Sequence, residues 1–121
     1  MKVKFVTSKV TIEGRLNNSQ IAKKIYESLP FEAKVNTWGK EIYFKIPLKL
    51  KLENPTTEVE IGDIAYWQEG SCLCIFFGPT PISINDKPLP ASEVEIVGEI
   101  TGDLSELENI QTADKINVLP L

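Results

Sequence analysis

The segment Gly62-Asp-Ile-Ala-Tyr-Trp-Gln-Glu-Gly-Ser-Cys-Leu-Cys-Ile-Phe-Phe-Gly-Pro-Thr-Pro81 says most about the fold of this chain. It contains two apolar runs, which a Gln68-Glu69-Gly70 turn separates, and it ends in a Gly-Pro-Thr-Pro corner. Short apolar runs bounded by glycine and proline are typical of paired β-strands. In the second run both alternating faces are apolar, which predicts a strand that is buried on both sides.

Alternation of apolar and polar residues extends the strand pattern to both sides of this segment. A period of two is typical of strands, because successive side chains point to opposite faces. We expect further strands at 2–5, 10–16, 31–38, 41–46 with a continuation through 48–53, 94–100 and 116–118. About eight strands result, which predicts a mainly β chain folded as a closed or nearly closed antiparallel barrel.

Two helices complete the predicted elements. Asn17 begins a capping-box pattern, with a glutamine three residues later, and Pro30 ends the apolar stripe that follows. This pattern predicts a helix over 18–29, whose stripe most simply caps an open end of the barrel. A second capping box, Asp103-Leu-Ser-Glu106, predicts a short helix near the end of the chain.

Size and charge exclude several classes of protein. The 121 residues, of which 42% are hydrophobic and 25% charged, predict one domain over 1–121 with a core of its own. The net charge is −4 and the lysines are scattered, which argues against a nucleic-acid partner, since phosphate binding needs clustered cations. No apolar run could span a membrane and no secretory signal is present, so we expect a cytoplasmic protein without a membrane partner.

Cys72 and Cys74 are the only cysteines, and the chain has no histidine. On one strand the two thiols face the same side but lie too far apart for an easy disulfide. Zinc takes four ligands, mostly cysteine and histidine, which this chain does not supply. We therefore expect two small buried side chains, and neither a metal nor another cofactor.

The order of these elements, together with Leu73-Cys-Ile-Phe-Phe-Gly-Pro-Thr-Pro81, resembles the cyclophilin-type peptidyl-prolyl isomerase fold. The chain is more closely similar to a family of small prokaryotic cyclophilin-like proteins of unsettled function. Strings such as Trp38-Gly-Lys-Glu-Ile-Tyr-Phe44 and Gly62-Asp-Ile-Ala-Tyr-Trp67 are landmarks expected in that family. The resemblance extends from about residue 2 to residue 118 and implies a cyclophilin-like barrel.

The comparison with true cyclophilins also shows departures. Phe77 matches the phenylalanine that packs on the substrate proline, but Ile75 stands where those enzymes carry a glutamine. Their catalytic arginine and their histidine have no counterpart, because the single arginine, Arg15, lies outside the matching motif. A cation near the prolyl nitrogen weakens the double-bond character of the peptide bond, and removing one such donor typically costs on the order of 10²–10³ in rate. The resemblance thus implies the fold without efficient isomerisation.

Aromatic side chains near strand ends form the candidate ligand-binding surface, and they are Trp38, Tyr43, Tyr66, Trp67 and Phe77. Such rings line clefts for peptides or small molecules, or they serve only as core packing. We assign Phe76, which is outside this set, to the core. Glu41 joins the set because it begins a strand beside Trp38 and Tyr43. Buried among rings, its pKa would rise and it could act as a general acid or base; on the surface it is an ordinary solvated charge.

These patterns predict a binding module that holds a small molecule or a peptide segment in an aromatic cleft, with no catalytic residue assigned. Three alternatives stay open, and the sequence does not decide whether the protein is an enzyme. The first is a weak or atypical prolyl isomerase. The second is an enzyme that uses Glu41 on a small metabolite, and the third is a purely structural subunit.

Overall fold

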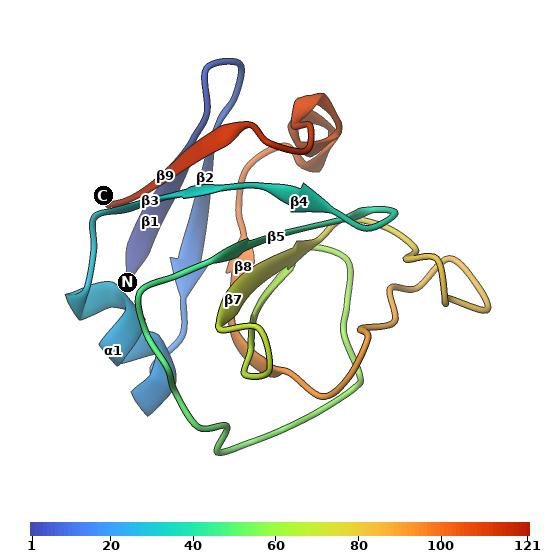
Figure 1. Ribbon diagram of the computed structural model, residues 1–121, viewed down its shortest axis with the longest axis horizontal. Coiled ribbons are helices and arrows are strands. Elements are labelled where there is room, and N and C mark those ends of the chain that lie inside the picture. Colours follow the sequence, from blue (N-terminus) through green and yellow to red (C-terminus); the bar gives the residue numbers. More distant parts are fainter.

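The computed structural model describes residues 1–121, and β-strands dominate it (Figure 1). In chain order the elements are β1 (Lys2–Val6), β2 (Thr11–Leu16), α1 (Gln20–Glu27), β3 (Phe31–Lys34), β4 (Asn36–Thr37), β5 (Glu41–Lys45), β6 (Asp63–Trp67), β7 (Cys72–Phe76), β8 (Glu95–Ile100), the 3-10 helix η1 (Leu104–Asn109) and β9 (Lys115–Pro120). The expected mainly β chain, with one longer and one short helix, is confirmed. Neither helix has the length and apolar character that a membrane span requires.

All nine strands belong to one antiparallel sheet with the order β3-β9-β1-β2-β8-β6-β7-β5-β4. The two ends of this order, β3 and β4, follow each other in the chain with only Val35 between them. β3 pairs with β9 and β4 pairs with β5, so the continuous segment 31–37 connects the first strand of the sheet to the last. The sheet therefore curls into the nearly closed barrel that the alternation predicted. It has nine strands rather than about eight because the strand expected at 31–38 divides into two.

Helix α1 packs against one end of the barrel (Figure 1). Its Ile21, Ala22 and Ile25 are buried in the barrel core, as the apolar stripe predicted. The helix begins later than the capping box indicated, because Ser19 and not Asn17 is its N-cap. The Ser19 hydroxyl accepts a hydrogen bond from the Ala22 amide at 3.1 Å, which satisfies one of the free amides of the first turn.

Residues 46–62, here called the strap, join β5 to β6 without forming a strand, so the expected continuation through 48–53 is wrong. A buried side chain takes the place of a partner strand. The Tyr66 hydroxyl accepts a hydrogen bond from the Leu50 amide at 3.0 Å and donates one to the Leu48 carbonyl at 2.9 Å. Both leucines still pack on the core. The period of two here reflects alternate burial alone, because the backbone groups bond to a side chain instead of a ladder.

Glu95 on β8 holds the next part of the strap. Its carboxyl group is buried, and Oε1 accepts hydrogen bonds from the amides of Glu53 and Asn54 at 2.7 and 2.8 Å. An isolated bridge between Thr56 and Val94 follows directly. The middle of the strap is thus attached through side chains and one bridge, whereas its two ends are attached by backbone hydrogen bonds at Ile46 and Gly62.

Strand β7 separates two apolar layers, as its two apolar faces predicted. Leu73 and Ile75 belong to the barrel core, whereas Cys74 and Phe76 belong to a second cluster on the outward face. Residues 77–94, here called the cavity loop, join β7 to β8 and appear in yellow to orange in Figure 1. This loop adds Val94 to the outward cluster, and the candidate site lies in this outer layer.

Candidate functional site

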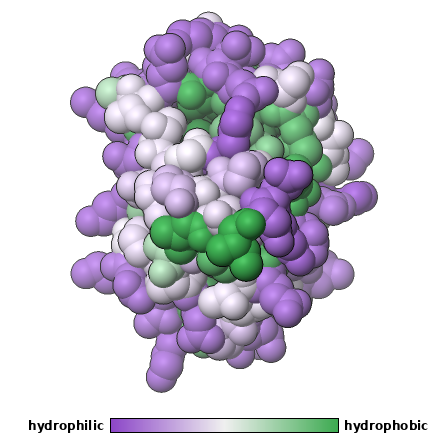
Figure 2. All heavy atoms as spheres, turned by 90° about the vertical axis from the view of Figure 1, so that its right-hand side faces the viewer, coloured by the Kyte–Doolittle hydropathy of each residue, from purple (hydrophilic) through white to green (hydrophobic).

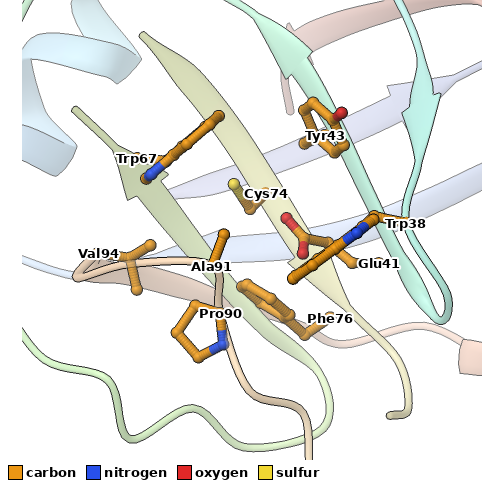
Figure 3. A pocket seen from close by; sticks show the side chains of 9 residues that line it. All are labelled: Trp38, Glu41, Tyr43, Trp67, Cys74, Phe76, Pro90, Ala91 and Val94. Atoms are coloured by element: carbon orange, nitrogen blue, oxygen red, sulfur yellow. The ribbon is translucent and has the colours of Figure 1, made fainter. Parts of the chain in front are cut away.

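A cavity of about 250 Å³ lies between the outward face of the sheet and the cavity loop (Figure 3). Its walls are mostly apolar, and the residues that line it are Trp38, Glu41, Tyr43, Trp67, Cys74, Phe76, Pro90, Ala91 and Val94. Larger hollows occur elsewhere on the surface, but polar and charged residues form most of their walls. An apolar cavity with few polar groups is the usual form of a small-ligand site.

The turn between β4 and β5 places Trp38 and Glu41 at the edge of this cavity. The two residues exchange backbone hydrogen bonds of 2.9 and 3.2 Å, which closes a two-residue turn over Gly39 and Lys40. Gly39 has a φ of 61°, a conformation that glycine adopts without strain. A Cβ at Gly39 would lie 2.9 Å from the Pro79 carbonyl oxygen, so the turn packs directly on the start of the cavity loop.

The register of the strands brings the other lining residues to the same face. Glu41 lies opposite Phe76 and Tyr43 lies opposite Cys74 in the β5–β7 ladder. From β6, Trp67 approaches Tyr43 edge to face, with 6.2 Å between the ring centroids. Such contacts between rings restrict both side chains and shape the cavity wall.

The cavity loop is fixed to this wall by a side-chain contact. The Trp67 indole nitrogen donates a hydrogen bond to the Ser92 hydroxyl at 2.7 Å, next to the lining residues Pro90, Ala91 and Val94. Figure 2 shows the side of the molecule from which the loop projects, where apolar side chains gather in the middle of a largely hydrophilic face. The loop presents Val94 to the cavity, whereas its Ile82 and Ile84 are exposed.

Glu41 is the only formally charged residue of the cavity lining, and only 6% of its surface is exposed. Burial raises the pKa of its carboxyl group from 4.5 to about 7, and a hydrogen bond from the Cys74 thiol lowers it in part. No ion pair includes this carboxylate. The adjacent Lys40 is directed elsewhere, since it pairs with Glu108 and its ammonium lies 5.9 Å from the centroid of the Phe77 ring.

The Cys74 thiol is held in its neutral form. Burial raises its pKa well above the ordinary value, and the charge of Glu41 and the hydrogen bond to it raise the pKa further. Burial also raises the pKa of Cys72. Both cysteines are free and buried, as expected from the sequence. Because a thiolate and not a thiol is the nucleophile, the raised pKa values disfavour a nucleophilic role for both cysteines. No group of three or more His, Cys, Asp or Glu side chains is placed to hold a metal ion.

Four of the six residues assigned to the candidate ligand site from the sequence line the cavity: Trp38, Glu41, Tyr43 and Trp67. The other two do not. Tyr66 is fully buried in the barrel core, where its hydroxyl bonds the strap. Phe77 packs on the core from the opposite side of the chain, because one step along a strand reverses the face. The low exposure of Glu41 also rules out its interpretation as a solvated charge.

Sequence reasoning missed five of the lining residues: Cys74, Phe76, Pro90, Ala91 and Val94. Phe76 is fully buried, as assigned, but it belongs to the outward cluster and lines the cavity. The alternation of side chains along β7 already places Cys74 and Phe76 on the same face. Alternation does not tell which of the two faces points outward. The proline-rich segment before β8 carried no periodic signal that could have located the other three.

Comparisons with known proteins agree with this architecture. A family model described as cyclophilin-like matches residues 1–119. The solution structure of a hypothetical protein from Archaeoglobus fulgidus, a prokaryote, superposes with a TM-score of 0.83 at 32% sequence identity. The match covers 100% of this chain and 95% of the other. Among curated proteins, none matches this sequence.

Proposed function

Because this chain belongs to the cyclophilin-like family, we propose that it uses the cyclophilin-like barrel as a binding module and not as an efficient isomerase. The ligand is a small molecule or a short peptide segment, and it occupies the cavity around Glu41. Trp38, Tyr43 and Trp67 supply the walls. The small volume of about 250 Å³ favours a single side chain or a compact molecule over an extended peptide.

The observation that carries this proposal is the unpaired carboxylate inside an aromatic cavity. Burying a charge without a basic partner is costly. Titratable groups with strongly perturbed pKa values in clefts are frequent at functional sites. Glu41 combines this perturbation with a preformed cavity, whereas every other carboxylate with a raised pKa lies outside the cavity lining.

A screen by NMR tests the proposal. Amide shifts of the labelled protein are followed with a fragment library and with proline-containing peptides. We expect shifts that cluster on β5, β7 and the cavity loop, and that weaken in the Trp38→Ala variant. Arg15→Ala is the matched control, since Arg15 lines a different hollow. A screen without any shift around the cavity would overturn the proposal.

Prolyl isomerisation has little support at the positions that the family resemblance implies. Arg15 is exposed, pairs with Glu99 at 3.1 Å on the β2–β8 ladder, and does not line the cavity. Ile75, at the position of the substrate-binding glutamine, lies in the barrel core. A protease-coupled peptide assay should therefore give a rate close to that of buffer. A clear rate that falls in Arg15→Ala or Phe77→Ala would restore the isomerase alternative.

Acid–base catalysis by Glu41 is the second candidate function. A pKa of about 7 is close to the optimum for a general acid or base at neutral pH. If a compound from the screen is converted by the protein, Glu41→Gln should abolish its conversion while binding is retained. Unchanged turnover in this variant would remove Glu41 from catalysis.

The structural-subunit alternative predicts a stable oligomer without ligand binding. Light scattering, which measures the mass of the particle in solution, tests this prediction.

We also place the protein in the cytoplasm, without a nucleic-acid or membrane partner. Its two cysteines are free, as is usual in a reducing compartment. Its net charge of −4 is unfavourable for association with phosphate backbones or anionic lipid surfaces. Fractionation of cells that express the tagged chain checks the location.

A further inference from the structure

We infer that the cavity recognises an organic ammonium group, with Glu41 as its counter-ion and the rings of Trp38, Tyr43 and Trp67 as its walls. This inference rests on the proposed binding function and specifies the chemistry of the ligand. The expected ligand is a compact quaternary ammonium ion or a protonated tertiary amine, either free or carried on a lysine side chain. Three observations support it: the arrangement of the rings, the charge of the lining and the volume of the cavity.

The rings are placed around the carboxylate. In Figure 3 the indoles of Trp38 and Trp67 are seen nearly edge-on, on opposite sides of the Glu41 carboxylate, and Tyr43 closes the space between them from β5. A group above the carboxylate therefore meets ring faces on more than one side. The face of an aromatic ring carries negative electrostatic potential, so it attracts cations within about 6 Å of its centroid and disfavours anions.

The charge of the lining is complementary to a cation. The titratable groups on the same face as Glu41 are Tyr43 and Lys45 from β5 and Cys72 and Cys74 from β7. Lys45 lies opposite Cys72 at the other end of the ladder, and its charge acts on that thiol. From β6 and the cavity loop the lining adds only Trp67, Pro90, Ala91 and Val94. Lys40, which adjoins Glu41 in the sequence, is already bonded to Glu108. No basic group of the protein neutralises the carboxylate, and a bound ammonium would do so.

The volume fits a small cationic head. About 250 Å³ accommodates a trimethylammonium group with a short chain, but not a large planar cofactor. The remaining walls, formed by Phe76, Pro90 and Val94, are apolar. Methyl groups on nitrogen match such walls better than the strongly hydrated –NH₃⁺ of an unmodified lysine. Methylated amines are therefore preferred over primary ones.

Binding of a cation is coupled to the protonation of Glu41. In the free protein the carboxyl group has a pKa of about 7, and a bound positive charge lowers this pKa. Binding below pH 7 must therefore release a proton. About nine-tenths of a proton is released at pH 6 and about one-tenth at pH 8 when the pKa in the complex lies well below 6. Affinity is highest above pH 7 and falls as the pH decreases, whereas a neutral ligand shows no such trend.

Choline and its uncharged isostere 3,3-dimethylbutan-1-ol give the test. Calorimetry and amide shifts are measured for both at pH 8 and pH 6, in two buffers of different ionisation enthalpy. At pH 8 we expect choline to bind at least about tenfold more tightly than the isostere. At pH 6 we expect choline binding to release protons. Glu41→Gln should reduce the difference between the two compounds and abolish the proton release, and Trp38→Ala should weaken choline binding. Arg15→Ala is the control, and it should leave choline binding and proton release unchanged.

Each other outcome has a definite meaning. If the neutral isostere binds in the cavity as tightly as choline, the cavity is a binding site but the ammonium inference is wrong. If neither compound binds while fragments shift the cavity residues, the inference again fails and the proposed function stands. If no compound of either set shifts the cavity, both fail. A trimethyl-lysine amide tested beside choline distinguishes a peptide-borne group from a free amine.

Discussion

Glu41 occupies a position at which an ionised carboxylate weakens the folded protein. Its pKa is raised from 4.5 to about 7 by burial. Between these two values the folded state holds a proton that the unfolded state has lost, so the free energy of unfolding falls as the pH rises. The favourable contribution is complete below about pH 4.5 and is lost once the pH passes 7.

Glu41→Gln should therefore stabilise the protein in a pH-dependent way. Glutamine resembles the protonated carboxyl group, so the variant and the wild type should be equally stable near pH 4.5. At pH 8 the variant should be more stable by about 1–3 kcal/mol, because a pKa shift of one unit corresponds to about 1.4 kcal/mol. Urea unfolding at both pH values measures this. A gain of the same size at both would contradict the burial of a titrating Glu41.

Tyr66 has a structural role that a phenylalanine cannot fill. Tyr66→Phe removes the hydroxyl that bonds the Leu48 carbonyl and the Leu50 amide. We expect a loss of about 1–3 kcal/mol in the free energy of unfolding, because two part-buried backbone groups lose their partner. Tyr43→Phe is the matched control, since no hydrogen bond is formed by the Tyr43 hydroxyl, and it should change stability by less than about 0.5 kcal/mol. Equal losses would contradict the assignment.

Among the elements, the β4–β5 turn connects the barrel to the cavity loop. Gly39→Ala would force a Cβ into a positive-φ position and place it 2.9 Å from the Pro79 carbonyl oxygen. We expect a loss of about 2–4 kcal/mol in the free energy of unfolding, together with a change in the fluorescence of the adjacent Trp38.

Gly62→Ala separates the two causes of that loss. Gly62 also has a positive φ, 99°, but a Cβ there would have its nearest contact 3.8 Å away, at Leu104. Strain alone should cost about 1–2 kcal/mol and leave the cavity intact. If both alanine variants lose the same stability, close packing of the turn on the cavity loop does not contribute.

The buried carboxyl group of Glu95 holds the backbone of the strap in place. Glu95→Ala removes the acceptor of the Glu53 and Asn54 amides. The free energy of unfolding should fall by about 2–4 kcal/mol, and hydrogen exchange at these two amides should accelerate more than at the amides of β7. Glu93→Ala, an exposed neighbour, is the control. Retained protection at residues 53 and 54 would show that the carboxylate does not hold the strap.

At the scale of the whole molecule, one sheet carries both the barrel core and the outer cavity. Trp38 adjoins β4 and Trp67 ends β6, so both indoles report on the outer layer. Because β7 belongs to both layers, we expect them to unfold together. Denaturation followed by tryptophan fluorescence and by far-UV circular dichroism should give coincident transitions. A separate, earlier fluorescence transition would show that the outer layer opens on its own.

Much of this architecture could be predicted from local patterns. Alternation at 10–16, 41–46 and 94–100 identified β2, β5 and β8, and the double apolar face of β7 predicted its burial between two layers. The pattern failed at 48–53, where alternate leucines are half-buried against the core without a ladder. Alternation reports which side chains are buried, and it does not report where the backbone hydrogen bonds go.

The site was predictable only in part, because a strand pattern has two equivalent faces. Trp38, Glu41 and Tyr43 were identified as neighbours in sequence, and they remain neighbours in the cavity. Phe76 and Phe77 differ by one position, and only the folded sheet decides that Phe76 faces the cavity and Phe77 the core side.

The sequence by itself determined the strands, the helix, the barrel and the absence of histidine from any site, since these follow from short-range periodicity and composition. Tertiary structure alone decided that Glu41 loses its water and keeps no basic partner. That outcome depends on the cavity loop closing over β5 and β7, a contact between segments that are far apart in the chain. Desolvation is a property of the assembled surroundings, so the local pattern that placed Glu41 beside Trp38 and Tyr43 could not decide between a buried and a solvated carboxylate.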